Sequence, residues 1–282
     1  MTRASAESMI ASTWTVAEET MRRVAAAKAT LAFAIAFSVL SLGVSYFGLA
    51  GYQASGFQGF GRVTTSLFNL VVYLVPLLAL ILGTAEVAGR REALALVLAQ
   101  PVGRLEVLLG SYLGLALALT AALVVGLGSA GALILLQTSA ASLNAYIVLV
   151  VLSVMLLLAF LAVSFLIAVL FLDRLRSMAA SILVWFACVI GYDLALIGIT
   201  SVLRGLPLKS FLLPAILLNP VDISRVLVTL AGGRGALFGP AGATLVETFG
   251  KPAGAAVAVA ALLLQVLIPL VICSRVFRTR DL

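Results

Sequence analysis

The side chains that usually carry out enzymatic or metal chemistry are scarce in this sequence. It contains no His and only two Cys residues, Cys188 and Cys273, which both lie inside apolar runs. Without His, the chain lacks the commonest proton shuttle, general base and metal ligand. The patterns of a phosphate-binding loop, a zinc protease, a serine hydrolase and a CxxC redox pair are also missing. We therefore expect no catalytic residue, no metal site and no disulfide framework in this chain.

One acidic residue, Asp193, stands within a long apolar run, WFACVIGYDLALIG. A charged side chain inside a membrane is costly, and it usually faces the interior of a helix bundle or water. Asp193 is therefore a candidate, with Tyr192, for lining a translocation path, or for pairing with Arg204 or Arg225. The alternative is structural: near the outer end of its span, Asp193 reaches the membrane interface, or Tyr192 or a neighbouring helix holds it.

The elements that position these residues follow from the composition. Of 282 residues, 63% are hydrophobic and 10% are charged, and the mean hydropathy is +1.23. A soluble domain has about 25% charged residues, so a soluble enzyme is excluded. Six apolar runs are long enough to cross a bilayer: residues 25–49, 64–86, 107–136, 145–172, 178–203 and 253–273. We expect an all-α polytopic membrane protein in which residues 1–282 form one transmembrane domain.

Residues 1–24 have a different pattern from the six spans. Apolar side chains recur at helical spacing from Ile10 to Val24, and the acid–base pairs Glu18–Arg22 and Glu19–Arg23 are four residues apart. This pattern predicts an amphipathic helix on the membrane surface, and a plain soluble extension is the alternative. In the third span, Gly110 and Gly114 form a GxxxG pattern that predicts close helix packing.

The distribution of charge predicts the orientation of the chain. Six spans place both termini on one side, and twelve of the 18 Lys and Arg residues fall on that side. It is therefore predicted to be cytoplasmic. The cytoplasmic connection 87–106 contains an amphipathic helical stretch that ends at Gln100 and Pro101, which indicates either a docking helix for a partner or an inert surface helix. The outer connection 204–252 contains apolar pieces too short to span, and we expect it to form an external helical cap.

Three blocks carry a resemblance to a known family. They are TWTVAEETMRRVAAAKATLAFAIAFSVLSLG, LALVLAQPVGRLEVLLGSYLGLALAL and LLNPVDISRVLVTLAG. The sequence resembles the permease subunits of type-two ABC exporters, over essentially the whole chain. The Gln-Pro-x-x-Arg turn points to this class. The Leu-Asn-Pro-x-Asp block and Asp193 make the chain similar to the permeases that serve maturation of nitrous oxide reductase, a periplasmic copper enzyme.

The resemblance implies a complex in the bacterial inner membrane, with two permease copies as a homodimer, each coupled to a cytoplasmic ATPase subunit. ATP and Mg²⁺ would bind to that ATPase, and this chain would hold no cofactor. It also implies a periplasmic partner protein contacted through Asn219, Pro220, Asp222 and Arg225, and no nucleic acid. The implied ATPase-coupling residues are Arg90, Arg91, Glu92, Gln100, Pro101, Arg104 and Glu106, with Asp173, Arg174 and Arg176 in a second turn. The run Gly89-Arg90-Arg91-Glu92 departs from the family, which has an acidic run there.

Several functions remain open at this stage. A general type-two exporter of a drug, lipid or polymer is the main alternative, and an ion-driven secondary transporter or a membrane-embedded enzyme is a weaker one, because both usually need more intramembrane acids than Asp193. The resemblance suggests copper or a sulfur species as the substrate. Copper favours thiolate, thioether or imidazole ligands, so a sulfur species or mechanical action on a periplasmic partner fits these residues better.

Overall fold

The computed structural model describes residues 3–50, 59–90, 103–135, 141–171, 173–202, 208–231 and 251–279, and every regular element within these ranges is a helix. In chain order they are α1 (Arg3–Ala25), α2 (Lys28–Ala50), α4 (Gly59–Val87), the 3₁₀ turn η1 (Ala88–Arg90), α6 (Arg104–Leu135), α7 (Ala141–Phe171), α8 (Arg174–Phe186), the π-helical turn η2 (Ala187–Gly191), α9 (Tyr192–Val202), α10 (Leu208–Leu218), α11 (Pro220–Ala231) and α13 (Lys251–Thr279).

Six helical segments are long and apolar enough to cross a membrane, which confirms the predicted all-α polytopic fold. They are α2, α4, α6, α7, the continuous segment α8–η2–α9, and α13, and each overlaps one of the predicted spans. Residues 3–25 form the helix α1, and α10 and α11 lie in the connection after the fifth span. Their positions on the membrane surface and in an external cap stay predictions. The predicted coupling stretch at 91–98 lies outside the described residues.

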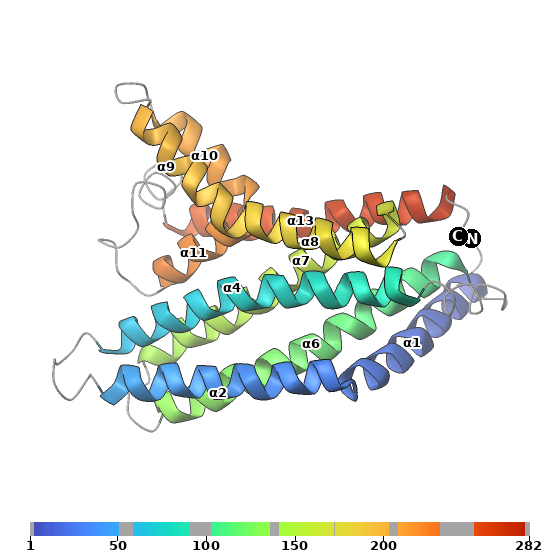
Figure 1. Ribbon diagram of the computed structural model, residues 1–282, viewed down its shortest axis with the longest axis horizontal. Coiled ribbons are helices and arrows are strands. Elements are labelled where there is room, and N and C mark those ends of the chain that lie inside the picture. Colours follow the sequence, from blue (N-terminus) through green and yellow to red (C-terminus); the bar gives the residue numbers. More distant parts are fainter. Residues whose placement is uncertain are drawn as a thin grey trace.

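The core of the bundle is formed by α4, α6 and α7, which pack against one another and against the other spans (Figure 1). α2 packs on α4 and α6, α8 packs on α4 and α7, and α13 packs on α6 and α7. The outer faces of α2, α8–α9 and α13 carry exposed Leu, Ile, Val and Phe side chains. In a bilayer such faces are compatible with lipid tails or with another apolar helix.

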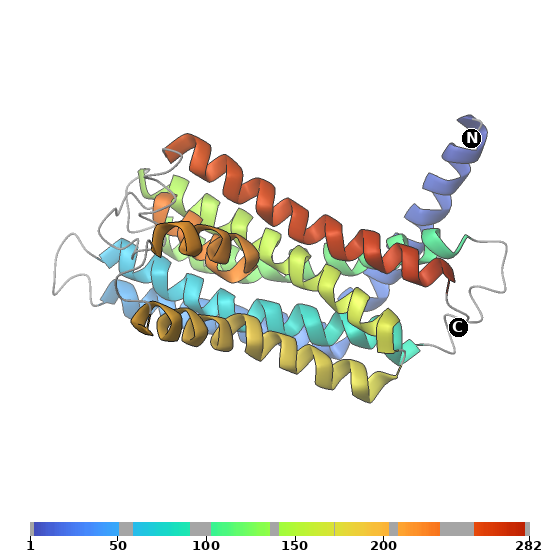
Figure 2. The same cartoon turned by 90° about the horizontal axis from the view of Figure 1, so that it is seen from above.

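Both termini lie at the same end of the bundle (Figure 1). From this end α1 leaves the bundle at an angle to the spans, while α2 runs along them (Figure 2). α1 packs on the first turns of α6, where an added Cβ at Gly110 or Gly114 would meet the backbone and side chains of α1. The close packing predicted for this glycine pair therefore occurs against the N-terminal helix.

Candidate functional site

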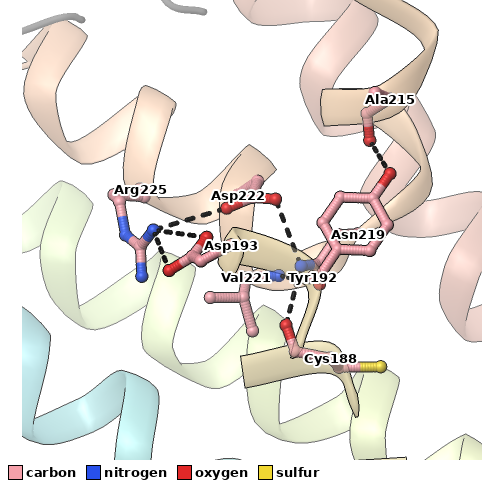
Figure 3. A network of polar contacts seen from close by, with 8 residues as sticks. All are labelled: Cys188, Tyr192, Asp193, Ala215, Asn219, Val221, Asp222 and Arg225. Atoms are coloured by element: carbon pink, nitrogen blue, oxygen red, sulfur yellow. Dashed lines mark hydrogen bonds and ion pairs between the residues drawn. The ribbon is translucent and has the colours of Figure 1, made fainter. Parts of the chain in front are cut away.

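The fifth span changes from α-helix to π-helix at Ala187–Gly191 and returns to α-helix at Tyr192. A π turn disturbs the regular backbone hydrogen bonding, and such turns are frequent at functional sites. Within this turn the carbonyl oxygen of Cys188 accepts a hydrogen bond of 2.8 Å from Nδ2 of Asn219 (Figure 3). A side chain from the connection after the span therefore binds a backbone group inside the π turn.

Asn219 also begins α11. Its Oδ1 accepts a hydrogen bond of 3.1 Å from the backbone N–H of Val221, and its backbone carbonyl accepts one of 3.1 Å from Ile223. Asn is a preferred N-cap residue, and Pro220 at the next position has no N–H to satisfy and a φ suited to the helix. The Asn-Pro pair of the Leu-Asn-Pro-x-Asp block is therefore explained by the start of a helix, whatever else it does.

Three charged side chains meet beside this cap. Arg225 donates from Nη1 to both carboxylate oxygens of Asp193, at 3.1 and 2.9 Å, and lies 3.4 Å from Oδ1 of Asp222 (Figure 3). The other oxygen of Asp222 accepts a hydrogen bond of 3.1 Å from Nδ2 of Asn219. Pairing with Arg225 was one of the two alternatives for Asp193, and the structure shows it. Arg204, the other possible partner, lies outside the described residues.

Asp222 is buried and lies outside the six candidate spans. Burial and the nearby negative charge of Asp193 raise the pKa of Asp222 to about 6, against the opposing effect of Arg225. Two carboxylates share one guanidinium here, and like charges at close range favour protonation of one of them. The charge of this cluster therefore depends on pH in the physiological range.

Tyr192 lies next to the charged cluster and contacts a different helix. Its hydroxyl donates a hydrogen bond of 2.6 Å to the backbone carbonyl of Ala215 in α10 (Figure 3). Between α9 and α10 is a cavity of about 220 Å³ with an apolar lining. The residues that line it are Tyr192, Ala195, Leu196, Ile199, Pro214, Ala215 and Leu218.

The fifth span is thus joined to α10 and α11 at three points, through Cys188, Tyr192 and Asp193. The structure brings Asp193, Asn219, Asp222 and Arg225 into one network, although their roles in a substrate path and a partner contact stay predictions. The part of the chain that the structure describes contains no group of three His, Cys, Asp or Glu residues that could hold a metal ion. These contacts attach the connection after the fifth span to the span itself.

The described residues among those predicted to couple to an ATPase belong to η1 and to the starts of α6 and α8, at the end of the bundle that holds the termini (Figure 1). Arg90 ends η1, and Arg104 and Glu106 lie in the first turn of α6. Oε2 of Glu106 accepts a hydrogen bond of 3.2 Å from the backbone N–H of Gly103, which is one half of a capping box. Four of the predicted coupling residues lie outside the described part: Arg91, Glu92, Gln100 and Pro101.

The second predicted coupling turn begins α8. Asp173 is the N-cap of this helix, and its side chain accepts a hydrogen bond of 2.8 Å from the backbone N–H of Arg176. Arg174 and Arg176 are exposed. A Cβ added to Gly89 would lie 3.7 Å from Cδ and Nε of Arg174, so the start of α8 lies beside η1. The start of the first predicted coupling segment therefore adjoins the second.

The sequence pattern missed one charged contact. The Glu18–Arg22 pair occurs, with 2.6 Å between its atoms, but Arg23 does not pair with Glu19 as its spacing predicted. Arg23 instead makes two hydrogen bonds, of 3.0 and 2.5 Å, to the carboxylate of Glu86 near the end of α4. The two residues are 63 positions apart. The one feature of the sequence that could have indicated this contact was an acid, Glu86, at the end of an apolar span.

The six candidate spans within the described ranges are those of a polytopic helical membrane protein. The profile of ABC-2 family transporter proteins matches residues 4–282, and the chain belongs to this family. Two relatives carry the name "Probable ABC transporter permease protein NosY". The protein from Pseudomonas aeruginosa is 33% identical over 226 residues, covering 78% of this chain and 82% of the relative. The protein from Stutzerimonas stutzeri is 32% identical over 257 residues, covering 89% and 92%.

Proposed function

We propose that this chain transmits conformational change from a cytoplasmic ATPase to the opposite face of the membrane. It is an ABC-2 permease, and an ABC permease works with an ATPase subunit. The observation that carries the proposal is the contact between η1 and the start of α8, because it brings the first residues of one predicted coupling segment beside the other. In this proposal ATP and Mg²⁺ bind to the ATPase, and this chain has no ATPase activity of its own.

The proposed assembly contains two copies of this chain in the bacterial inner membrane, with both termini in the cytoplasm. The apolar outer faces of α2, α8–α9 and α13 support a homodimer in the membrane, because a second copy can pack against them. The excess of Lys and Arg on the side of the termini supports the orientation. The network around Asn219 joins α9 to α11 (Figure 3), and these helices lie toward the other end of the bundle (Figure 1), where a periplasmic partner would bind.

We further propose that the complex serves the maturation of nitrous oxide reductase. The support is the name NosY that both relatives carry, together with the resemblance of the Leu-Asn-Pro-x-Asp block to that group of permeases. The chain has no His, and its two Cys residues are half-buried or buried. Copper favours soft or imidazole ligands. The proposed cargo is therefore a sulfur species, or a mechanical change in the partner, rather than bare copper ions ligated along this chain.

Charge reversal at the first coupling segment tests the link to the ATPase. We expect Arg90→Glu combined with Arg91→Glu to reduce permease-stimulated ATP hydrolysis by about tenfold or more, because like charges at an interface oppose binding by several kcal/mol. Membrane insertion should be unchanged. The measurement is co-purification of the cognate ATPase and its hydrolysis rate in proteoliposomes.

The matched control reverses two other arginines at the same end of the chain. Arg275→Glu with Arg278→Glu changes the net charge equally, at exposed positions of α13. This control should retain the stimulation. Full ATPase coupling in the Arg90 and Arg91 variant would refute the assignment, and equal loss in both variants would show a nonspecific effect of charge.

A further inference from the structure

The N-terminal helix α1 contacts the chain on both sides of the predicted coupling connection 87–106. Before the connection, Arg23 makes its two hydrogen bonds to Glu86, the penultimate residue of α4. After the connection, α1 packs on the first turns of α6. The two ends of one connection are therefore held by the same helix.

The contact on α6 depends on the absence of side chains. A Cβ on Gly110 would meet Val16 and the carbonyl oxygen of Thr13, and a Cβ on Gly114 would meet Thr20 and backbone atoms of α1. At both glycines these atoms lie closer to the added Cβ than ordinary van der Waals contact allows. The backbones of the two helices thus approach closely enough that α1 cannot shift over α6 without losing this fit.

The Arg23–Glu86 ion pair is largely shielded from solvent by packed side chains. The side chain of Glu86 is 10% exposed and that of Arg23 is 31% exposed, whereas the pair Arg22–Glu18 one residue earlier on α1 is 74% and 44% exposed. Glu86 lines a small cavity together with Leu108 and Ser111 of α6, Phe165 of α7 and Phe277 of α13. The carboxylate thus lies where α1, α4, α6, α7 and α13 come together.

A buried carboxylate in such a place needs a fixed cation. A bidentate pairing of Arg with a carboxylate fixes direction as well as charge, and loss of one partner of a buried pair is far more destabilising than loss of a surface pair. Arg23 is also the third residue from the end of α1, just before the chain turns into α2. Arg23 therefore ties the turn between α1 and α2 to the end of α4.

We propose that Arg23 is a positioning residue for ATPase coupling: through Glu86 it holds the start of the 87–106 connection in register with its end, which α1 holds at Gly110 and Gly114. This inference rests on the proposed coupling function. α1 is then a brace that makes the connection move as one body with α4 and α6. Without the brace, displacement of the connection would be absorbed locally and would not reach the spans.

Hydrogen exchange tests the brace without any ATPase. In the purified chain, Arg23→Ala should accelerate exchange of the backbone amides in 84–106 by about tenfold, since local opening then costs less free energy. The control Arg22→Ala removes the exposed pair on the same helix and should leave these rates within about twofold of the wild type. Equal exchange in Arg23→Ala and the wild type would overturn the proposal.

ATPase coupling tests the consequence. With the cognate ATPase in proteoliposomes, Arg23→Ala should still bind the ATPase, but permease-stimulated hydrolysis should fall by about fivefold or more, and Arg22→Ala should behave as the wild type. The reversed pair Arg23→Glu with Glu86→Arg should restore at least part of the stimulation, while each reversal alone should not. A merely structural role predicts loss of ATPase binding in proportion to activity.

The outcomes separate the two proposals. If the wild-type chain does not stimulate the ATPase while Arg23→Ala still alters exchange, the coupling function fails and the brace stands as a structural feature. If the wild type couples and Arg23→Ala couples equally, the positioning role is refuted. Should Arg23→Ala not give a monodisperse protein, Arg23→Lys takes its place, because it keeps the charge and loses the bidentate geometry.

Discussion

Asp222 lies buried in the first turn of α11, between Asn219 and Arg225, and its carboxylate shares Arg225 with Asp193. Two residues beside Asp222 each make further contacts. Asn219 caps α11 and binds the π turn, and Arg225 connects α11 to the fifth span. Substitution of one residue therefore changes several contacts at once, so single variants here report on the network and not on one bond.

The raised pKa of Asp222 predicts a pH dependence of stability. Because burial and Asp193 raise this pKa from 3.8 to about 6, the folded protein binds the proton more tightly than the unfolded chain. The free energy of unfolding should therefore fall as pH rises from about 4 to about 6, and Asp222 should contribute no further change above that. We expect Asp222→Asn to remove this pH-dependent part of the free energy of unfolding, about 3 kcal/mol.

The measurement is thermal unfolding in detergent between pH 4 and pH 8, with the difference between wild type and variant isolating Asp222. Glu19→Gln at an exposed position of α1 is the control and should leave the slope unchanged. An Asp222→Asn variant with the wild-type slope would show that folding does not raise the pKa of Asp222.

At the scale of elements, two glycines of α6 that are fourteen residues apart have opposite surroundings. Gly114 faces the backbone of α1, whereas a Cβ on Gly128 would meet nothing within 4 Å. In a helix, Ala is more favourable than Gly by about 1 kcal/mol. The same substitution should therefore stabilise or leave unchanged the protein at one position and destabilise it at the other.

We expect Gly114→Ala to lower the free energy of unfolding by about 1–3 kcal/mol through overpacking, and Gly128→Ala to raise it or leave it unchanged. Thermal unfolding of both variants in the same detergent measures the difference. If the two substitutions have equal effects, α1 does not pack tightly on α6 in the membrane protein. The wild type and Gly128→Ala serve as the two references.

At the scale of the whole molecule, the described parts contain no cluster of metal-binding side chains and one compact polar network near the far end of the bundle from the termini. In the proposed function, the ATPase and the periplasmic partner bind at these two ends. The predicted coupling surface lies at one end and the Asn219 network at the other, and the spans α4, α6 and α7 connect them.

The maturation proposal predicts a phenotype for the whole complex. In the organism that carries this chain, deletion of its gene should leave nitrous oxide reductase without its full copper content, and the wild-type gene should restore it. The Arg90→Glu, Arg91→Glu variant should not restore it, because force from the ATPase no longer reaches the chain. Fully copper-loaded reductase in the deletion strain would contradict the proposal and favour a general exporter.

The six spans could be predicted from the sequence because membrane burial is a property of each segment by itself. A run of about 20 apolar residues must cross the bilayer as a helix, whatever its neighbours are. The same local logic predicted the glycine pair at Gly110 and Gly114 and the Glu18–Arg22 pair. The interruption of the fifth span by the π turn at Ala187–Gly191 carried no such signal, because Asn219, far along the chain, supplies a hydrogen bond within it.

The sequence by itself determined that this is a helical membrane protein with six spans, in which Asp193 is the one acid away from the ends of the apolar runs. Only the tertiary structure decided that Asp193 pairs with Arg225 rather than with another basic group. It also decided that Arg23 pairs with Glu86 and not with Glu19. The physical reason is the same in both cases. An apolar run enters the lipid bilayer because of its own composition. A charged side chain pairs with whichever opposite charge the packing of the helices brings within hydrogen-bonding distance.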